Sequence, residues 1–206
     1  MVLSIVVLIS GGGSNLRALL EAAADANFPA RIVAVGSDND APGLEHAEAF
    51  GVPSFTVVPT AFADRASWGD ELLAQVEAWS PDLVVCAGFM RILPPRFVAA
   101  LSPNLINTHP ALLPAFPGAH AVRDALAAGV AETGVTVHIV DEGVDTGPVL
   151  VQRVVPILAG DTEFDLHERI KIVERDVIVS AVESIAERRI VLPEPARNRQ
   201  HQENPS

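Results

Sequence analysis

The chain has 206 residues, 49% of them hydrophobic, and a formal net charge of −12 from 14 basic and 26 acidic side chains. So acidic a surface, without a run of basic residues, argues against a nucleic-acid partner. The apolar stretch over residues 2–9 is too short to span a bilayer and has no basic residues before it, so we expect neither a membrane helix nor a signal peptide and place the protein in the cytoplasm. The single cysteine, Cys86, rules out an internal disulfide and a multi-cysteine metal site, and its apolar neighbours predict a buried packing role.

Strand-like runs alternate with helix-like periodicity through the first half of the chain. A short apolar run over residues 3–9 ends in three glycines, and a helix capped by Ser14 or Asn15 follows. Further strands are expected at 31–37, 52–58 and 82–88, with helices at 41–51 and 65–79. This order predicts an α/β fold with a parallel, doubly wound, Rossmann-like sheet.

The pattern changes beyond residue 88, because six prolines between positions 94 and 117 break any long helix. One strand is expected there, at 104–109. Two more, at 133–141 and 147–157, are joined by an acidic turn, so the C-terminal part of the sheet is expected to be mixed. A capping box at Thr162 begins a long amphipathic helix that reaches Ile185. We expect a single domain over residues 1–195 and a polar tail over 196–206.

The glycine loop GGGSN at 11–15 stands between a strand and a helix. Backbone N–H groups and the helix dipole favour an anion at such a place, so the loop predicts a phosphate pocket. The lysine-bearing loop of nucleotide triphosphatases is absent, and Leu16 stands where GxGxxG requires glycine. A tight turn that needs glycine only for its geometry explains the loop equally well.

Asn107 and His109 end an expected strand, and side-chain alternation directs both to one side. Ligands bind at the strand ends of open α/β sheets, so an amide donor and a titratable imidazole suit acyl transfer there. Asp145, in the turn DEGVDTGP, is a candidate partner of His109, although a simple turn aspartate facing solvent is the alternative.

Three further charged residues allow two interpretations each. Arg91, within the apolar segment GFMRILP, suits a flat ligand with an acidic end, or is an arginine whose stem covers apolar surface. Lys171 and Glu174 lie three residues apart on the last helix, which makes them neighbours that either contact a ligand or form an ordinary surface pair.

The segments GGGSN, GFMRIL, NTHPALLPAFPG and DEGVDTGPVL, taken with their spacing, resemble the family of phosphoribosylglycinamide formyltransferases, the folate enzymes of purine synthesis. The resemblance spans roughly residues 3 to 190. It implies direct transfer of a formyl group from 10-formyltetrahydrofolate, as cosubstrate, to the amine of glycinamide ribonucleotide. It implies neither a metal nor a covalent enzyme intermediate.

Carried over motif by motif, the resemblance also assigns site residues. The catalytic residues would be Asn107, His109 and Asp145. The ribonucleotide would contact Gly13, Ser14, Asn15, Lys171 and Glu174. The folate would contact Arg65, Met90, Arg91, Ile92, Leu93, Asn107, Asp141 and Val144, with the turn from Asp141 to Thr146 closing over its ring and both arginines near its acidic portion.

The mechanism that follows is attack of the substrate amine on the formyl carbon. Asn107 and His109 would donate hydrogen bonds to the oxyanion. These donors would therefore contribute to turnover more than to substrate affinity. Asp145 would favour the charged imidazole and help to move a proton from the attacking nitrogen to the leaving N10, through water.

Two departures from the family pattern concern the last helix and the catalytic strand. The stretch KIVERDVIV lacks the histidine after the glutamate and the Tyr-Pro pair of many relatives, which weakens the assignment of Lys171 and Glu174. Thr108 replaces a frequent isoleucine and should point away from the site. Relatives are often dimeric, so a homodimer is an expectation as well.

Four rival functions are open. A formyltetrahydrofolate hydrolase shares the core but usually carries an N-terminal regulatory domain, and an initiator-tRNA formyltransferase adds a C-terminal RNA-binding domain and positive charge. A nucleotide-binding module would explain the glycine loop, with Asp38 as a ribose contact, but not the catalytic trio. A hydrolase built on Ser14, His109 and Asp145 lacks a GxSxG elbow.

Overall fold

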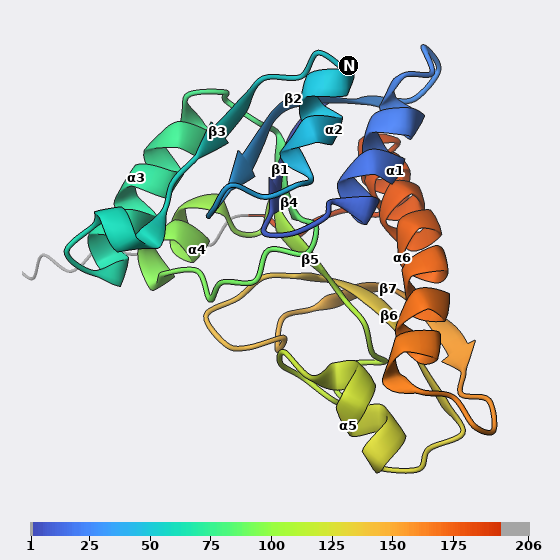
Figure 1. Ribbon diagram of the computed structural model, residues 1–206. Coiled ribbons are helices and arrows are strands. Elements are labelled where there is room, and N and C mark those ends of the chain that lie inside the picture. The colour runs from blue at the N-terminus through green and yellow to red at the C-terminus, as the bar shows by residue number, and fades with distance from the viewer. Residues whose placement is uncertain (1, 195–206) are drawn as a thin grey trace, which may run out of the picture.

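The computed structural model describes residues 2–194, so the polar tail expected over 196–206 lies outside the described residues. Seven strands form one sheet flanked by helices (Figure 1). The strands are β1 Leu3–Ile9, β2 Ala30–Ser37, β3 Ser54–Thr56, β4 Leu83–Cys86, β5 Leu105–His109, β6 Glu132–Ile139 and β7 Val149–Pro156. The α-helices are α1 Ser14–Ala23, α2 Leu44–Ala49, α3 Arg65–Glu77, α4 Pro95–Leu101, α5 Ala121–Ala127 and α6 Glu163–Ala186, with a short 3-10 helix, η1, at Pro59–Ala61.

The strand order is β3-β2-β1-β4-β5-β6-β7. Strands β1 to β5 pair in parallel, whereas β6 pairs antiparallel with both β5 and β7. The order reverses direction at β1, with β2 on one side and β4 on the other, as in a doubly wound sheet. The predicted fold class, a mostly parallel sheet with a mixed C-terminal part, is confirmed.

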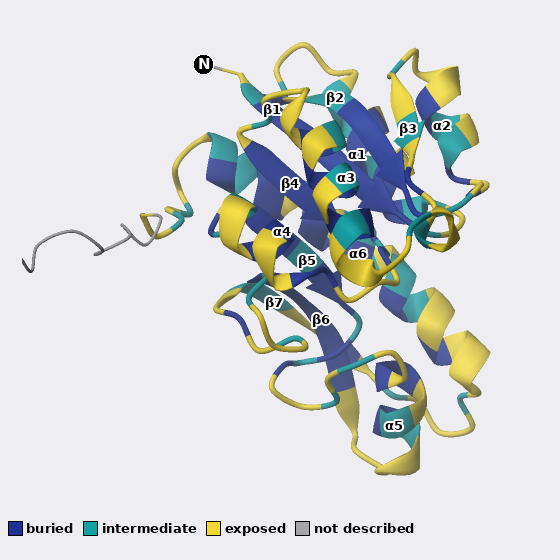
Figure 2. Ribbon diagram, turned by 90° about the vertical axis from the view of Figure 1, so that its left-hand side faces the viewer, coloured by how far each residue is buried: buried dark blue, intermediate teal, exposed yellow. Residues whose placement is uncertain are grey.

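Both faces of the central strands β1 and β4 are buried, because these two strands consist almost entirely of apolar residues, whereas the edge strands β3 and β7 are largely exposed (Figure 2). Along β1, Ile5, Val7 and Ile9 pack with helices α1 and α6, whereas Val6 and Leu8 pack on the opposite face with residues of α3 and α4. The period-2 alternation therefore assigns each strand residue to one of two cores.

Two helices lie in the region where the prolines led us to expect one strand and no long helix. Helix α4 begins at Pro95, directly after Pro94 at its N-cap. Proline is well suited to the first turn, where its missing N–H has no partner to lose, so these prolines begin a short helix. Helix α5 has only seven residues, too few for a clear periodic signal.

The carboxyl ends of β1, β4 and β5 meet at one edge of the sheet, with the loops that follow them. This edge receives the glycine loop, the segment after β4 and the last residues of β5. Within residues 2–194 no helix is long and apolar enough to cross a membrane.

Candidate active site

Asn107 and His109 are the third and fifth residues of β5 and share one face of the sheet, as the alternation predicts. Asn107 lies beside Cys86 of β4 and His138 of β6 in the strand register. Thr108 points to the opposite face, where its hydroxyl donates to Glu174 of α6 (3.1 Å). The strand therefore presents its residues to two different polar surroundings.

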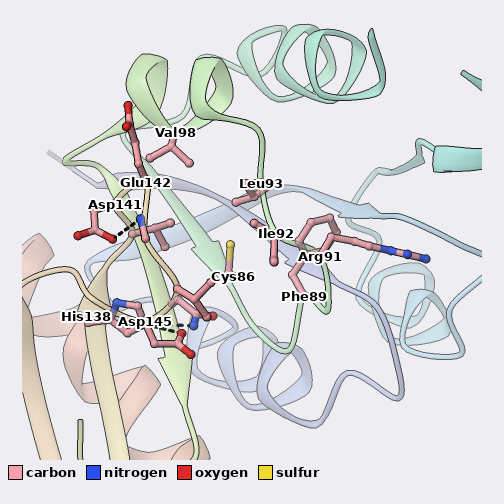
Figure 3. Close-up of a pocket in the computed structure, with 14 residues that line it drawn as sticks. Cys86, Phe89, Arg91, Ile92, Leu93, Val98, His138, Asp141, Glu142 and Asp145 are labelled. Atoms are coloured by element: carbon pink, nitrogen blue, oxygen red, sulfur yellow. Dashed lines mark hydrogen bonds and ion pairs between the residues drawn. The ribbon is translucent and has the colours of Figure 1, made fainter. Parts of the chain in front are cut away.

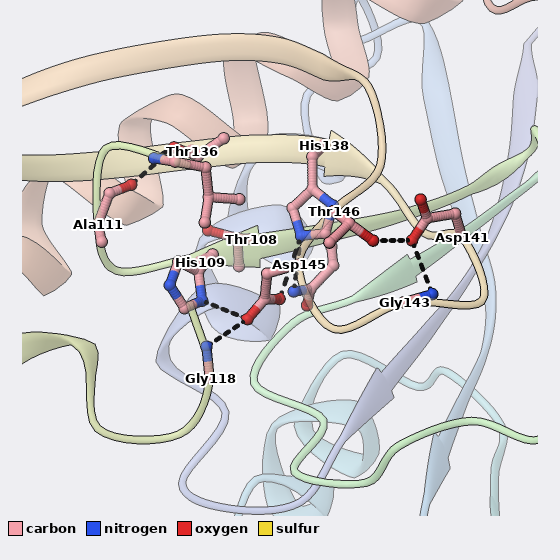
Figure 4. A network of polar contacts seen from close by, with 12 residues as sticks. Thr108, His109, Ala111, Gly118, Thr136, His138, Asp141, Gly143, Asp145 and Thr146 are labelled. Atoms are coloured by element: carbon pink, nitrogen blue, oxygen red, sulfur yellow. Dashed lines mark hydrogen bonds and ion pairs between the residues drawn. The ribbon is translucent and has the colours of Figure 1, made fainter. Parts of the chain in front are cut away.

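Both ring nitrogens of His109 face oxygen atoms, and Figure 4 shows the contact of one of them with Asp145. Nδ1 lies 3.3 Å from Oδ2 of Asp145, and Nε2 lies 2.8 Å from the carbonyl oxygen of Phe116. A carbonyl and a carboxylate only accept, so the arrangement is satisfied when both nitrogens carry protons, that is, by the imidazolium. The interpretation of Asp145 as a turn aspartate facing only solvent is wrong.

Asp145 is held in the turn by a left-handed backbone conformation (φ 55°) and by a hydrogen bond from the Gly118 N–H to its Oδ2 (2.7 Å). Burial alone would raise the pKa of this carboxyl. The contact with the His138 ring, the hydrogen bond from the Gly118 N–H and the charge of His109 together outweigh burial and hold the pKa below its ordinary value. Asp145 is therefore an anion well below neutral pH.

His138 belongs to the same cluster, and the sequence reasoning missed it. Its ring is buried, with Nε2 3.2 Å from Nδ2 of Asn107 and 3.5 Å from Oδ1 of Asp145. Its Nδ1 lies 2.9 Å from the carbonyl oxygen of Ile139. The alternation in TGVTVHIVD, which places Thr136 and His138 on one face of a buried strand, is the signal that marks it.

A pocket opens beside Asn107, His138 and Asp145 (Figure 3). The segment after β4 and the turn between β6 and β7 form its walls. The lining residues are Cys86, Phe89, Arg91, Ile92, Leu93, Val98, Asn107, His138, Val140, Asp141, Glu142, Gly143, Val144 and Asp145.

Polar contacts join the segment 90–93 to the residue after β2 on one side and to the start of α3 on the other. Nε of Arg91 lies 2.5 Å from Oδ2 of Asp38, which is 2% exposed at the end of β2. Arg65 donates from Nε to the Ile92 carbonyl (3.0 Å) and from Nη2 to the Leu93 carbonyl (2.9 Å). Arg91 therefore forms an ion pair with Asp38, and Asp38 faces this arginine where a nucleotide-binding module would use it for a ribose.

Asp141 braces the turn on the other side of the pocket. Its carboxylate accepts from the Gly143 N–H (3.1 Å) and from the Thr146 hydroxyl (2.7 Å). Val144, on this turn, is 47% exposed, and Ile92, on the opposite wall of the pocket, is 60% exposed. These apolar side chains would be covered by a flat ligand between the two walls.

The glycine loop turns into α1 at Gly13, whose φ of 68° is left-handed. A Cβ at this position would lie 2.9 Å from the Cα of Gly43, so glycine is required by both conformation and space. Asn15 is buried, and its Oδ1 has no hydrogen-bond partner among the described residues. A buried amide oxygen without a partner is unusual in a protein core, which makes Oδ1 of Asn15 a candidate acceptor for a ligand.

Glu174 and Lys171 are not a surface pair, which corrects that interpretation. Lys171 pairs with Glu168 (2.6 Å), whereas Glu174 points inward and is 8% exposed. Burial raises the pKa of the Glu174 carboxyl, against the opposing hydrogen bonds from Thr108 and Asn15 and the charges of His109 and Lys171. Glu174 therefore connects the glycine loop, through Asn15, to the face of β5 on which Thr108 lies. Residues 2–194 contain no group of three or more His, Cys, Asp or Glu side chains placed to hold a metal ion.

A known protein family matches most of the chain. The model of the formyl transferase family matches residues 3–182, and the chain belongs to this family. This match confirms the resemblance drawn from the motifs, since it covers all four of them.

The most similar proteins narrow the class further. The chain is 54% identical to the phosphoribosylglycinamide formyltransferase of Mycobacterium tuberculosis over 88% of this chain and 84% of the relative. It is 41% identical to that of Escherichia coli, over 94% of this chain and 92% of the relative. The crystal structure of glycinamide ribonucleotide transformylase 1 from Symbiobacterium toebii superimposes with a TM-score of 0.90, at 41% identity, over 94% of this chain and 92% of that one.

Proposed function

We propose that the protein transfers the formyl group of 10-formyltetrahydrofolate to the amine of N1-(5-phospho-D-ribosyl)glycinamide, which yields the N2-formyl product and tetrahydrofolate in de novo purine synthesis. The observation that carries this proposal is the cluster at the pocket end, where Asp145 lies between the rings of His109 and His138, beside the Asn107 amide. Amide, imidazolium and carboxylate are the groups that transfer of a neutral acyl group to an amine requires.

The folate ring would lie in the pocket beside Asn107. Main-chain groups of Met90 to Leu93 and of the 141–146 turn would read its hydrogen-bonding edge, while Phe89 and Val140 supply apolar contact. Arg65 leads outward to a second, open hollow, which it lines together with Phe62, Trp68 and Met90. The benzoyl-glutamate portion fits this hollow, because an aromatic ring and a carboxylate match its aromatic and guanidinium groups.

The ribonucleotide would bind with its phosphate at the N-terminus of α1. Gly13, Ser14 and Asn15 present N–H groups there, and the helix dipole favours an anion. Oδ1 of Asn15, which has no hydrogen-bond partner in residues 2–194, and the inward carboxyl of Glu174 are acceptors beside that loop, and both suit the hydroxyl and amine groups of the substrate. Lys171, three residues before Glu174 on α6, would contribute its charge.

In the reaction, the amine attacks the formyl carbon, and the C–N10 bond breaks after a proton moves from the attacking nitrogen to N10. Asn107 donates an amide N–H to the tetrahedral oxyanion, and His109 donates from Nε2. In this structure Nε2 is bound to the Phe116 carbonyl, so the oxyanion must take the place of that carbonyl, and the loop 110–118 must shift when substrates bind. Asp145 keeps the ring charged and, through water, accepts and returns the proton.

One assay tests this function directly. Tetrahydrofolate release from 10-formyltetrahydrofolate is followed with and without glycinamide ribonucleotide. Release that requires the ribonucleotide is the expected result. Release without it would assign the chain as a formyltetrahydrofolate hydrolase instead, and no release under either condition would leave only a binding function.

A further inference from the structure

The hydrogen bonds of His138 define which of its ring nitrogens carries a proton. Nδ1 lies 2.9 Å from the Ile139 carbonyl oxygen, which only accepts, so Nδ1 is protonated. Nε2 lies 3.2 Å from Nδ2 of Asn107, an amide nitrogen that only donates, so Nε2 must offer its lone pair. Both contacts are satisfied at once only by the uncharged ring with its proton on Nδ1.

His138 therefore differs in charge from His109, although both rings contact the same carboxylate. Asp145 presents Oδ2 to Nδ1 of His109 at 3.3 Å and Oδ1 to Nε2 of His138 at 3.5 Å (Figure 4). A protonated Nε2 would donate to Asp145 and meet the Asn107 N–H as a second donor. The uncharged ring leaves the negative charge of Asp145 to His109 alone.

We infer that His138 is a positioning residue that orients the catalytic amide: its Nε2 accepts one N–H of Asn107 and so directs the second N–H into the pocket, toward the place of the formyl oxygen. Strand pairing sets this contact, because Asn107 and His138 are register partners on β5 and β6. His138 is 2% exposed, so no bulk water competes for the amide. Without this acceptor, the amide is free to present Oδ1 to the oxyanion, which would repel it.

This inference rests on the proposed function for its kinetic consequences, but the contact itself can be measured independently. In the wild-type protein, the 15N chemical shifts of the His138 ring should show a protonated Nδ1 and an unprotonated Nε2 at neutral pH. A protonated Nε2 would overturn the inference whether or not the protein transfers formyl groups. Wild-type turnover with glycinamide ribonucleotide reports separately on the proposed function.

Two variants separate the roles of the ring nitrogens. His138→Asn places an N–H donor near Nδ1 but no acceptor at Nε2, whereas His138→Gln extends an amide oxygen to the place of Nε2. We expect His138→Asn to lower kcat at least tenfold, with the KM of both substrates changed less than about threefold, because loss of one oriented oxyanion donor costs on the order of 100-fold. His138→Gln should recover most of that loss. Unchanged kcat in His138→Asn, or no recovery in His138→Gln, would overturn the inference.

A double variant tests whether His138 acts through Asn107. The kcat of Asn107→Ala/His138→Asn should lie within about twofold of that of Asn107→Ala alone, since there is no amide left to orient. Multiplied losses would mean that His138 acts by another route. Thr133→Val is the matched control for buried β6 substitutions, because the Thr133 hydroxyl is buried without a hydrogen-bond partner in the described residues, and its kcat should equal that of the wild type.

Discussion

Nδ1 of His109 lies 3.3 Å from Oδ2 of Asp145, although the two residues are 36 positions apart in the sequence. The strand β5 places one partner, and the turn between β6 and β7 brings the other back to it. Strand β6 runs antiparallel to β5 and ends beside Ile106, so the turn that follows it folds back along β5 and brings Asp145 to His109. A carboxylate held here favours the charged form of the imidazole, which the proposed mechanism uses.

Replacing Asp145 with asparagine should lower kcat by about 100-fold to 10,000-fold, the range of a lost acid–base partner. The amide can still accept the Gly118 N–H, so the turn should persist, but it no longer balances the charge on His109. Steady-state kinetics at neutral pH, with circular dichroism as a check on folding, measures this. A variant with wild-type kcat would remove Asp145 from the mechanism.

Removing the carboxylate of Asp38 should raise the KM for the folate, on the order of tenfold, without a comparable change for the ribonucleotide. The reason is that Asp38 holds Arg91 and with it the segment 90–93 that walls the pocket. Asp38→Ala is compared with Asp70→Ala, which removes an exposed ion pair with Arg96 on α4 and should leave both KM values unchanged. Equal KM values in the two variants would mean that the Asp38–Arg91 pair does not order the folate wall.

Glu174→Gln should become more stable relative to the wild type as pH rises. Burial raises the pKa of Glu174, so the folded protein holds this proton more tightly than the unfolded chain, and folding loses stability as pH rises above the ordinary value of 4.5. Glutamine has no proton to lose. Urea unfolding at pH 4 and pH 8 should therefore show a stability difference that grows with pH.

The control for this prediction is Glu168→Gln on the same helix. The hydrogen bond from Lys171 lowers the pKa of Glu168, so this substitution should lose a small stabilising contact that is present above the ordinary pKa. Its stability difference should therefore have the opposite sign at pH 8. If the free energy of unfolding of Glu174→Gln differed from that of the wild type by the same amount at both pH values, the pKa of Glu174 would not be raised by burial.

Asp161→Asn should lower the stability of the protein against urea at neutral pH but not in strong acid. The hydrogen bond from Arg169 lowers the pKa of Asp161 from 3.8 to about 2, with a further contribution from the Leu158 N–H. The ionised carboxylate thus stabilises the fold above pH 3.8, and this contribution disappears as pH falls toward 2. Urea midpoints measured from pH 7 to pH 2 should converge for the two proteins, and a constant difference would contradict the assignment.

The sequence predicts the sheet well because its strands are apolar runs of the right length between glycines and capping residues. It predicts less where prolines stand, since Pro94 and Pro95 end one helix pattern as readily as they begin α4. At the site, alternation alone places Asn107 and His109 together. The contact with Asp145 and the ion pair of Arg91 with Asp38 join residues that no local pattern connects, and both needed the folded chain.

His138 is a site residue that the sequence pattern alone did not identify. Its position on a buried strand, two residues after Thr136, is visible in the sequence, but its importance depends on which β5 residue lies opposite. A shift of the register by one residue would turn it to the other face of the sheet. Register is set by the whole sheet and not by the strand, so the residue was overlooked.

We propose that Asn107, near the end of β5, stabilises the oxyanion of formyl transfer. The kinetics of Asn107→Ala with 10-formyltetrahydrofolate and glycinamide ribonucleotide test it most directly. We predict a fall in kcat of about 100-fold to 1,000-fold, equivalent to roughly 3 kcal/mol of barrier, with KM values changed only slightly. A kcat equal to that of the wild type, or a loss confined to KM, would contradict this account.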